Sequence, residues 1–127
     1  MTYKLTIERK PSYLHAVVSG LNAKENVARY LEDIIWECVD RKCFRVLIEE
    51  RLEGPRLGTT DVFELASEGA RKTFGTIKSI AYVDVNAEGD LMSFAETVAV
   101  NRSMPVKVFQ TVAEAEKWLL RTDAEIA

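Results

Sequence analysis

The residues that most readily carry chemistry in this 127-residue chain are one histidine and two cysteines. A thiol beside an imidazole can act as a nucleophile, and four such ligands can hold zinc. Cys38 and Cys43 lie among apolar neighbours, however, and no spacing places either beside His15. We therefore expect two buried free thiols and a structural or surface histidine. The sequence predicts no catalytic residues, no metal and no cofactor, and so no enzyme.

A second candidate is the segment from Asp84 to Asp90, where acidic or amide side chains alternate and a glycine follows. Calcium loops begin in this way. The pattern then fails, because Glu88 stands where an Asp or Asn is expected and Ala95 stands where a bidentate Glu is needed. A turn that leads into a helix explains the same residues.

The third candidate is a polar rim. Ligands of open α/β sheets bind beyond the carboxyl ends of the strands. In this chain the segments that follow two buried strands are polar and of mixed charge. A partner or ligand rim would consist of Arg51, Glu53, Arg56, Thr59, Thr60, Asp84 and Asn86. A merely solvated loop rim is the alternative reading.

Composition limits the partners. The chain is 47% hydrophobic and 29% charged, with 17 basic and 20 acidic residues mixed along it and a net charge of −3. A nucleic-acid-binding surface needs a basic stripe, which the sequence lacks, so no nucleic acid is expected. The first residues do not resemble a signal peptide, and no run approaches the ~18 apolar residues of a membrane span. These features predict a soluble cytoplasmic protein.

Hydrophobic periodicity predicts the elements that must position these residues. Strands are expected at residues 3–9, 13–19, 44–49, 77–85 and 106–109, and helices at 23–39, 62–70, 90–100 and 112–119. Capping boxes are expected at Asn22 with Glu25 and at Thr111 with Glu114, and Thr59, Thr60 or Asp61 is expected to cap the second helix. The order β-β-α-β-α-β-α-β-α indicates one α/β domain, residues 1–127, with a mixed, mainly parallel five-stranded sheet and an antiparallel first strand.

The third predicted helix has an apolar surface wider than one stripe, formed by Leu91, Met92, Phe94, Ala95 and Val98. Packing on the sheet explains such a surface. The alternative is a helix that opens over an apolar pocket, so that Met92 and Phe94 face a lipid or a membrane.

Three stretches carry a family resemblance: Arg45-Val-Leu-Ile-Glu-Glu-Arg-Leu-Glu-Gly54, Ile80-Ala-Tyr-Val-Asp84 before a helix with Phe94-Ala95, and Pro105-Val-Lys-Val-Phe109 before Ala113-Glu-Ala-Glu-Lys-Trp-Leu119. With the element order, they resemble the SpoIIAA-like branch of the STAS superfamily, which includes bacterial anti-sigma-factor antagonists, and more distantly the CRAL-TRIO lipid-transfer fold. The Asp-Ser-Ser-Gly-type site of phosphorylated antagonists is replaced here by Leu57-Gly58-Thr59-Thr60-Asp61. Helix capping is the expected role of these threonines, with phosphorylation as the alternative.

Two functions follow. The first is a non-enzymatic regulatory domain that binds a protein partner through the loop from Arg51 to Thr60. The alternative is lipid or apolar-ligand binding, with reversible membrane association through the third helix. A homodimer is a further expectation if all helices cover one sheet face. The alternative is that the second face of the sheet is solvated and carries Lys4, Thr6, Glu8 and Arg45.

Overall fold

The computed structural model describes residues 3–54, 57–73, 76–84, 89–102 and 105–121, and the side chains of residues 89–92 lie outside that description. Its elements follow the predicted order. They are β1 (Tyr3–Arg9), β2 (Leu14–Leu21), α1 (Lys24–Asp40), β3 (Arg45–Glu53), α2 (Thr59–Thr73), β4 (Ser79–Asp84), α3 (Gly89–Asn101), β5 (Val106–Phe109) and α4 (Val112–Leu119).

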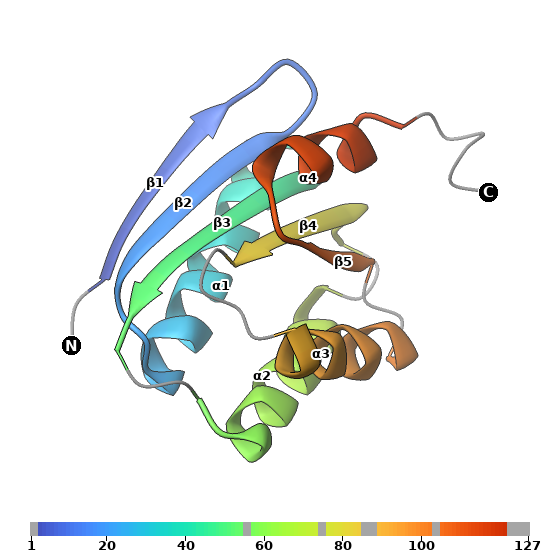
Figure 1. Cartoon of the computed structure of the whole chain (residues 1–127). Coiled ribbons are helices and arrows are strands. Elements are labelled where there is room, and N and C mark those ends of the chain that lie inside the picture. Colours follow the sequence, from blue (N-terminus) through green and yellow to red (C-terminus); the bar gives the residue numbers. More distant parts are fainter. Residues whose placement is uncertain (1–2, 55–56, 74–75, 85–88, 103–104, 122–127) are drawn as a thin grey trace.

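The strands form one sheet in chain order, β1-β2-β3-β4-β5 (Figure 1). β1 is antiparallel to β2, and the other three pairs are parallel, which confirms the predicted mixed sheet. Parallel strands that follow one another across a sheet through right-handed crossovers place all their helices on the same face. Accordingly α1, α2 and α3 cover one face, and α4, which follows the last strand, packs on the other (Figure 1).

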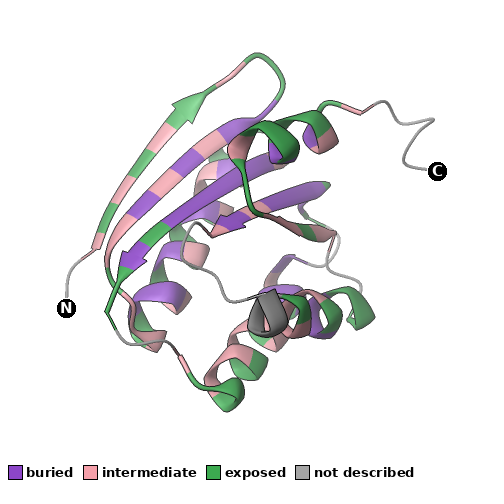
Figure 2. Ribbon diagram, in the orientation of Figure 1, coloured by how far each residue is buried: buried purple, intermediate pink, exposed green. Residues whose placement is uncertain are grey.

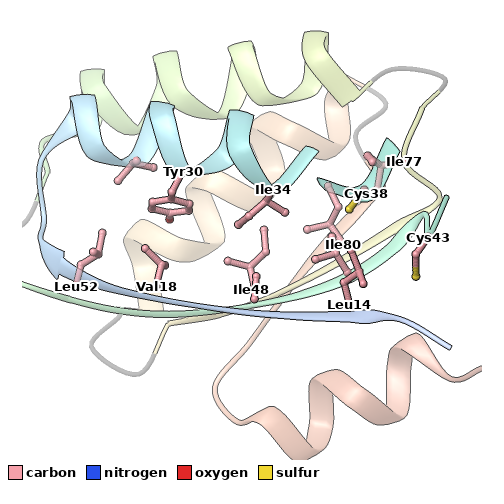
Figure 3. Close-up of a cluster of buried hydrophobic side chains, with 13 residues drawn as sticks. Leu14, Val18, Tyr30, Ile34, Cys38, Cys43, Ile48, Leu52, Ile77 and Ile80 are labelled. Atoms are coloured by element: carbon pink, nitrogen blue, oxygen red, sulfur yellow. The ribbon is translucent and has the colours of Figure 1, made fainter. Parts of the chain in front are cut away.

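The main core lies between the sheet and α1 (Figure 3). Strand residues alternate between faces, so Val46 and Ile48 of β3 point into this core while Leu47 points toward α4. Tyr30 and Ile34 of α1 are almost fully buried against the strands. The alternation continues along β2, whose buried and half-buried residues follow one another (Figure 2).

A second, smaller core lies under α4. Ala115 and Leu119 pack there on Leu47, Ala81 and Val83. α4 contacts β3, β4 and β5, so among the described residues it leaves the β1 part of this face uncovered. Lys4, Thr6 and Glu8 are exposed on it, as a solvated face requires, whereas the Arg45 Nη1 donates to the Leu119 carbonyl oxygen at 3.1 Å.

The helix starts differ from the prediction in two places. α1 has Ala23 at its N-cap without a side-chain hydrogen bond, so the predicted capping box of Asn22 and Glu25 is wrong. Asn26 Nδ2 instead donates to the Leu21 carbonyl oxygen at 2.9 Å, a contact that ties the helix start to the end of β2.

α2 begins at Thr59, and the Gly58 carbonyl oxygen accepts from the Val62 N–H at 3.1 Å. Thr59, Thr60 and Asp61 therefore lie within the first turn instead of capping it. The predicted cap of the last helix is confirmed, because the Thr111 Oγ1 accepts from the Glu114 N–H at 3.2 Å.

Candidate functional site

The candidate site depends on the length of β3. The sequence predicts a loop from Glu50 onward, but the strand continues to Glu53. Glu50 is therefore a strand residue and only 7% exposed. By alternation it shares the face of Ile48 and Leu52, toward α1, while Glu49 and Arg51 share the opposite face.

Glu50 lines a cavity of about 140 Å³ between the sheet and the three helices of this face. Most of the wall is apolar. α1 contributes Val27 and Leu31, and α2 contributes Val62, Leu65, Ala66 and Gly69. The rest of the apolar wall consists of Ala95 and Ala99 of α3, Ile48, Ile80, Val106 and Val108 of the strands, and Leu57. The polar lining residues are Asn22, Glu50, Tyr82, Asp84 and Glu96. The cavity thus has apolar walls and an acidic end.

Three oxygen atoms meet at the acidic end: Glu50 Oε2 and the hydroxyls of Tyr30 and Tyr82. Each hydroxyl contacts the carboxylate oxygen, and the two hydroxyls contact each other. An ionised carboxylate donates nothing, and each tyrosine donates one proton. Both hydroxyls can therefore donate to Glu50 Oε2, which favours the charged form of this carboxyl and lowers its pKa.

From the neighbouring strand, Asp84 acts in the opposite direction. It lies opposite Glu50 in the β3–β4 register, and a neighbouring carboxyl group disfavours ionisation of Glu50. Burial is the largest cause that raises the pKa of Glu50 to about 7, and Asp84 adds to it, although the two tyrosine hydroxyls act in the opposite direction. Burial also raises the pKa of Tyr30 and Tyr82, so both stay neutral donors.

Glu96 of α3 also lines the cavity. Glu96 Oε1 accepts from the Val108 backbone N–H of β5 at 2.8 Å. This bond holds α3 against the last strand of the sheet. It also satisfies one strand N–H with a side chain, so the wall at that point depends on the position of α3.

A separate polar cluster lies across the sheet. Glu49 is 4% exposed, and its Oε1 lies 3.0 Å from His15 Nε2, while the Arg51 guanidinium contacts Oε2. His15 is half-buried in this pair, which supports the structural role predicted for it. Arg51 and Asp84, predicted to share one rim, therefore face opposite sides of the sheet.

The other predicted residues are not gathered at the cavity. Glu53, Thr59 and Thr60 are exposed, and Phe94 is half-buried but does not line the cavity. Arg56, Asn86 and the Met92 side chain lie outside the described residues.

Both cysteines are buried free thiols, as predicted, and burial raises the pKa of Cys38 to about 12. Within the described ranges, no three His, Cys, Asp or Glu side chains are grouped as metal ligands. No helix in that part of the chain is both long and apolar enough to cross a membrane.

The sequence reasoning missed Tyr30, Tyr82 and Glu96, and it placed Glu50 in a loop instead of in a strand. One signal for Glu50 was available: Val46, Ile48, Glu50 and Leu52 occupy every second position. In a strand that spacing places all four on one face. No local pattern links Tyr30 and Tyr82 to that carboxylate, because they come from another helix and another strand.

Comparison with known proteins identifies the fold. A solved structure of an uncharacterized DUF3478-family protein with a SpoIIAA-like fold, from Shewanella loihica PV-4, matches with a TM-score of 0.56. The match covers 92% of this chain and 93% of that chain at 18% identity. No family model matches the sequence, and no curated protein matches it. The fold is therefore SpoIIAA-like, as the sequence resemblance predicted.

Proposed function

We propose that this chain, whose fold is SpoIIAA-like, binds a small and largely apolar molecule in the cavity between the sheet and helices α1 to α3. The observation that supports this function is the cavity itself, with apolar walls and a few convergent polar groups at one end. That end lies at the carboxyl ends of β3 and β4, where ligands of open α/β sheets usually bind.

The volume of the cavity limits the size of the ligand. An apolar protein cavity of roughly 150 Å³ accepts benzene, and this cavity measures about 140 Å³. A membrane lipid has acyl chains several times larger. Such a chain exceeds the volume of this cavity. The described arrangement therefore favours a compact ligand over a lipid.

We propose binding instead of catalysis. The described residues of the cavity wall include no Ser, Cys, His or Lys nucleophile, and the Glu50, Tyr82 and Glu96 side chains there are held in hydrogen bonds. The Glu50 carboxyl, buried among apolar groups and tyrosines, is suited to hold a polar group of a ligand in place.

The test uses a neutral ligand of matching size and a variant that fills the cavity. Cyclohexanol, added to the ¹⁵N-labelled protein, should shift the amide NMR signals of cavity residues. Ala66→Leu adds three carbons to the α2 wall and should abolish these shifts. Ala113→Leu, on the exposed side of α4, is the matched control and should bind as the original chain does.

A dispersed amide spectrum shows whether Ala66→Leu is folded, and Val62→Phe fills the same cavity from another position. Unchanged shifts in both folded variants, or no cavity shifts in the original chain at saturating cyclohexanol, would contradict the proposal.

The second candidate function is binding of a protein partner through the surface between Arg51 and Thr60. It is supported by the exposure of Glu53, Thr59 and Thr60, which present a polar surface around the end of β3 and the start of α2. Thr60→Ala should weaken capture of a specific partner, whereas Thr6→Ala, an exposed threonine on β1, should not. Equal capture by both variants would remove this surface from consideration.

A further inference from the structure

β1 is an edge strand, because in the described part of the chain it pairs only with β2 (Figure 1). An edge strand directs half of its backbone N–H and C=O groups away from the sheet, where another strand can bind them. Edge strands that stay unpaired usually carry charges that prevent such a contact. The arrangement of the charges on β1 therefore decides whether its outer edge repels or accepts a second strand.

Opposite charges stand at equal distances on either side of Thr6, the central residue of β1. Lys4, Thr6 and Glu8 are exposed. When two copies of β1 pair antiparallel about a two-fold axis at Thr6, Lys4 of each copy lies opposite Glu8 of the other. Facing opposite charges stabilise an antiparallel pair, and so do facing threonines. Glu8 accepts from Lys10 Nζ at 3.0 Å, but its side chain is 71% exposed and stays accessible to a second lysine.

The neighbouring registers match less well. A two-fold axis at Leu5 would place Lys4 opposite Thr6, so that the lysine has no acidic residue opposite it. A two-fold axis at Ile7 would place Lys4 opposite Lys10, and facing like charges destabilise the pair. Of these three registers, only the one centred on Thr6 combines opposite charges on one face with Leu5 opposite Ile7 on the other.

The same register covers apolar surface on the α1 side of the sheet. Leu5 and Ile7 are half-buried there and line a groove together with Trp36 of α1, which is 63% exposed. The other residues that line this groove are charged. A two-fold axis perpendicular to the sheet keeps both copies of α1 on one side, so the second β1 brings its own Leu5 and Ile7 to the face of Trp36. An apolar centre with an aromatic residue and a polar rim is typical of protein interfaces.

We propose that this chain forms a homodimer in which the β1 strands of two copies pair antiparallel, centred on Thr6, so that the two five-stranded sheets continue into one another. The contact is isologous, because each copy contributes the same surface. It uses the edge of the sheet and not the face that α4 partly covers. None of its residues lines the ligand cavity, so the dimer is independent of the proposed ligand.

Charge reversal tests the register. In a homodimer, Lys4→Glu places two glutamates opposite each other at both ends of the paired strands, and Glu8→Lys places two lysines there. Each variant alone should raise the dimer dissociation constant about tenfold, because two attractive pairs become repulsive. An equimolar mixture of the two variants should form a heterodimer with nearly the original affinity, because every glutamate of one chain then faces a lysine of the other.

Sedimentation velocity of the full chain over a concentration series measures these constants, at about 0.05 M salt to keep screening weak. Lys117→Glu is the matched control, because it changes the net charge by the same amount at an exposed position of α4, a helix that contacts β3, β4 and β5. It should dimerise as the original chain does. A dispersed amide spectrum shows that each variant is folded.

A disulfide tests the contact at Thr6 itself. Facing Cα atoms of an antiparallel pair lie about 4.5–5.5 Å apart, a distance that a disulfide spans. Thr6→Cys should therefore give a covalent dimer under mild oxidation, and the two native cysteines are buried. Glu8→Cys should not, because the two copies of residue 8 lie four positions apart along the paired strands, at least about 13 Å.

Several results would overturn the dimer. One is an original chain that stays monomeric up to about 1 mM. Equal dimerisation of Lys4→Glu and Lys117→Glu would show that the copies meet through another surface. A mixture of Lys4→Glu and Glu8→Lys that remains monomeric would contradict the charge pairing. A disulfide in Glu8→Cys but not in Thr6→Cys would contradict the register.

Discussion

Replacement of Glu50 by glutamine should stabilise the protein at alkaline pH and leave it almost unchanged at acidic pH. The pKa of Glu50 rises from 4.5 to about 7 on folding, chiefly through burial. The sign follows from proton binding. Below about pH 4.5 the carboxyl is protonated in both the folded and the unfolded chain. Between the two pKa values the folded chain holds a proton that the unfolded chain has lost, so stability falls as the pH rises.

The size of the effect follows from the two pKa values. Each tenfold change in proton affinity corresponds to about 1.4 kcal/mol, so the rise to about 7 represents about 3 kcal/mol in the free energy of unfolding. Glu50 is only 7% exposed, and solvent screening therefore removes little of this value. Glutamine carries no charge at any pH, and its amide can still accept from Tyr30 or Tyr82 and donate to Asp84. At about pH 8 we expect Glu50→Gln to be on the order of 1–3 kcal/mol more stable than the original chain.

Urea denaturation at about pH 4.5 and about pH 8, followed by circular dichroism, measures this difference. Glu49→Gln is the control, because Glu49 is equally buried but pairs with His15 and Arg51, and its replacement should destabilise the protein. Parallel pH profiles for Glu50→Gln and the original chain would refute the reasoning. So would a loss of stability in Glu50→Gln at about pH 8.

Other replacements test the packing around the site by urea denaturation. Leu119→Ala removes a 1% exposed side chain beneath α4 and should cost about 2–5 kcal/mol; a loss below about 1 kcal/mol would mean that α4 is loosely held. Gly54→Ala should cost about 1–2 kcal/mol, because its φ is +106° and a Cβ would lie 2.9 Å from Leu21 Cδ1. Gly58→Ala, whose Cβ meets nothing within 4 Å, should stay within about 1 kcal/mol of the original chain, and an equal loss would contradict the account. Thr111→Ala removes the cap of α4 and should cost about 1 kcal/mol; an unchanged unfolding midpoint would contradict that role.

Hydrophobic periodicity predicted the architecture well, because each helix and strand buries the face on which its apolar residues recur. The alternation of Tyr3, Leu5 and Ile7 predicted β1, and the structure pairs that strand antiparallel to β2. Helical spacing along residues 24–40 likewise predicted α1. Because the parallel strands follow one another in chain order, right-handed crossovers then place α1, α2 and α3 on one face of the sheet.

The candidate site was harder to predict, because its polar residues are satisfied by distant partners. The run Glu49-Glu50-Arg51 is typical of a loop, yet it forms the second half of a strand. Glu49 is compensated by His15 and Arg51 on one face, and Glu50 by Tyr30 and Tyr82 on the other. These partnerships exist only after the sheet and α1 have come together.

The sequence also did not determine on which side of the sheet the last helix packs. A dimerisation face was expected if every helix covered one face, but α4 covers part of the second face with Ala115 and Leu119. The right-handed crossover rule applies only to a helix that connects two parallel strands. No strand follows α4 among the described residues, so its position depends on packing alone.

The most direct test of the cavity as a binding site is an intermolecular NOE measurement on the methyl-labelled protein with cyclohexanol. The account predicts NOEs from the ligand to the methyl groups of Ala66, Ala99 and Val106, which lie on α2, α3 and β5 around the cavity. NOEs confined to methyl groups outside the cavity, such as that of Ala113 on α4, would contradict it. So would a saturated sample without any NOE from the ligand to these three residues.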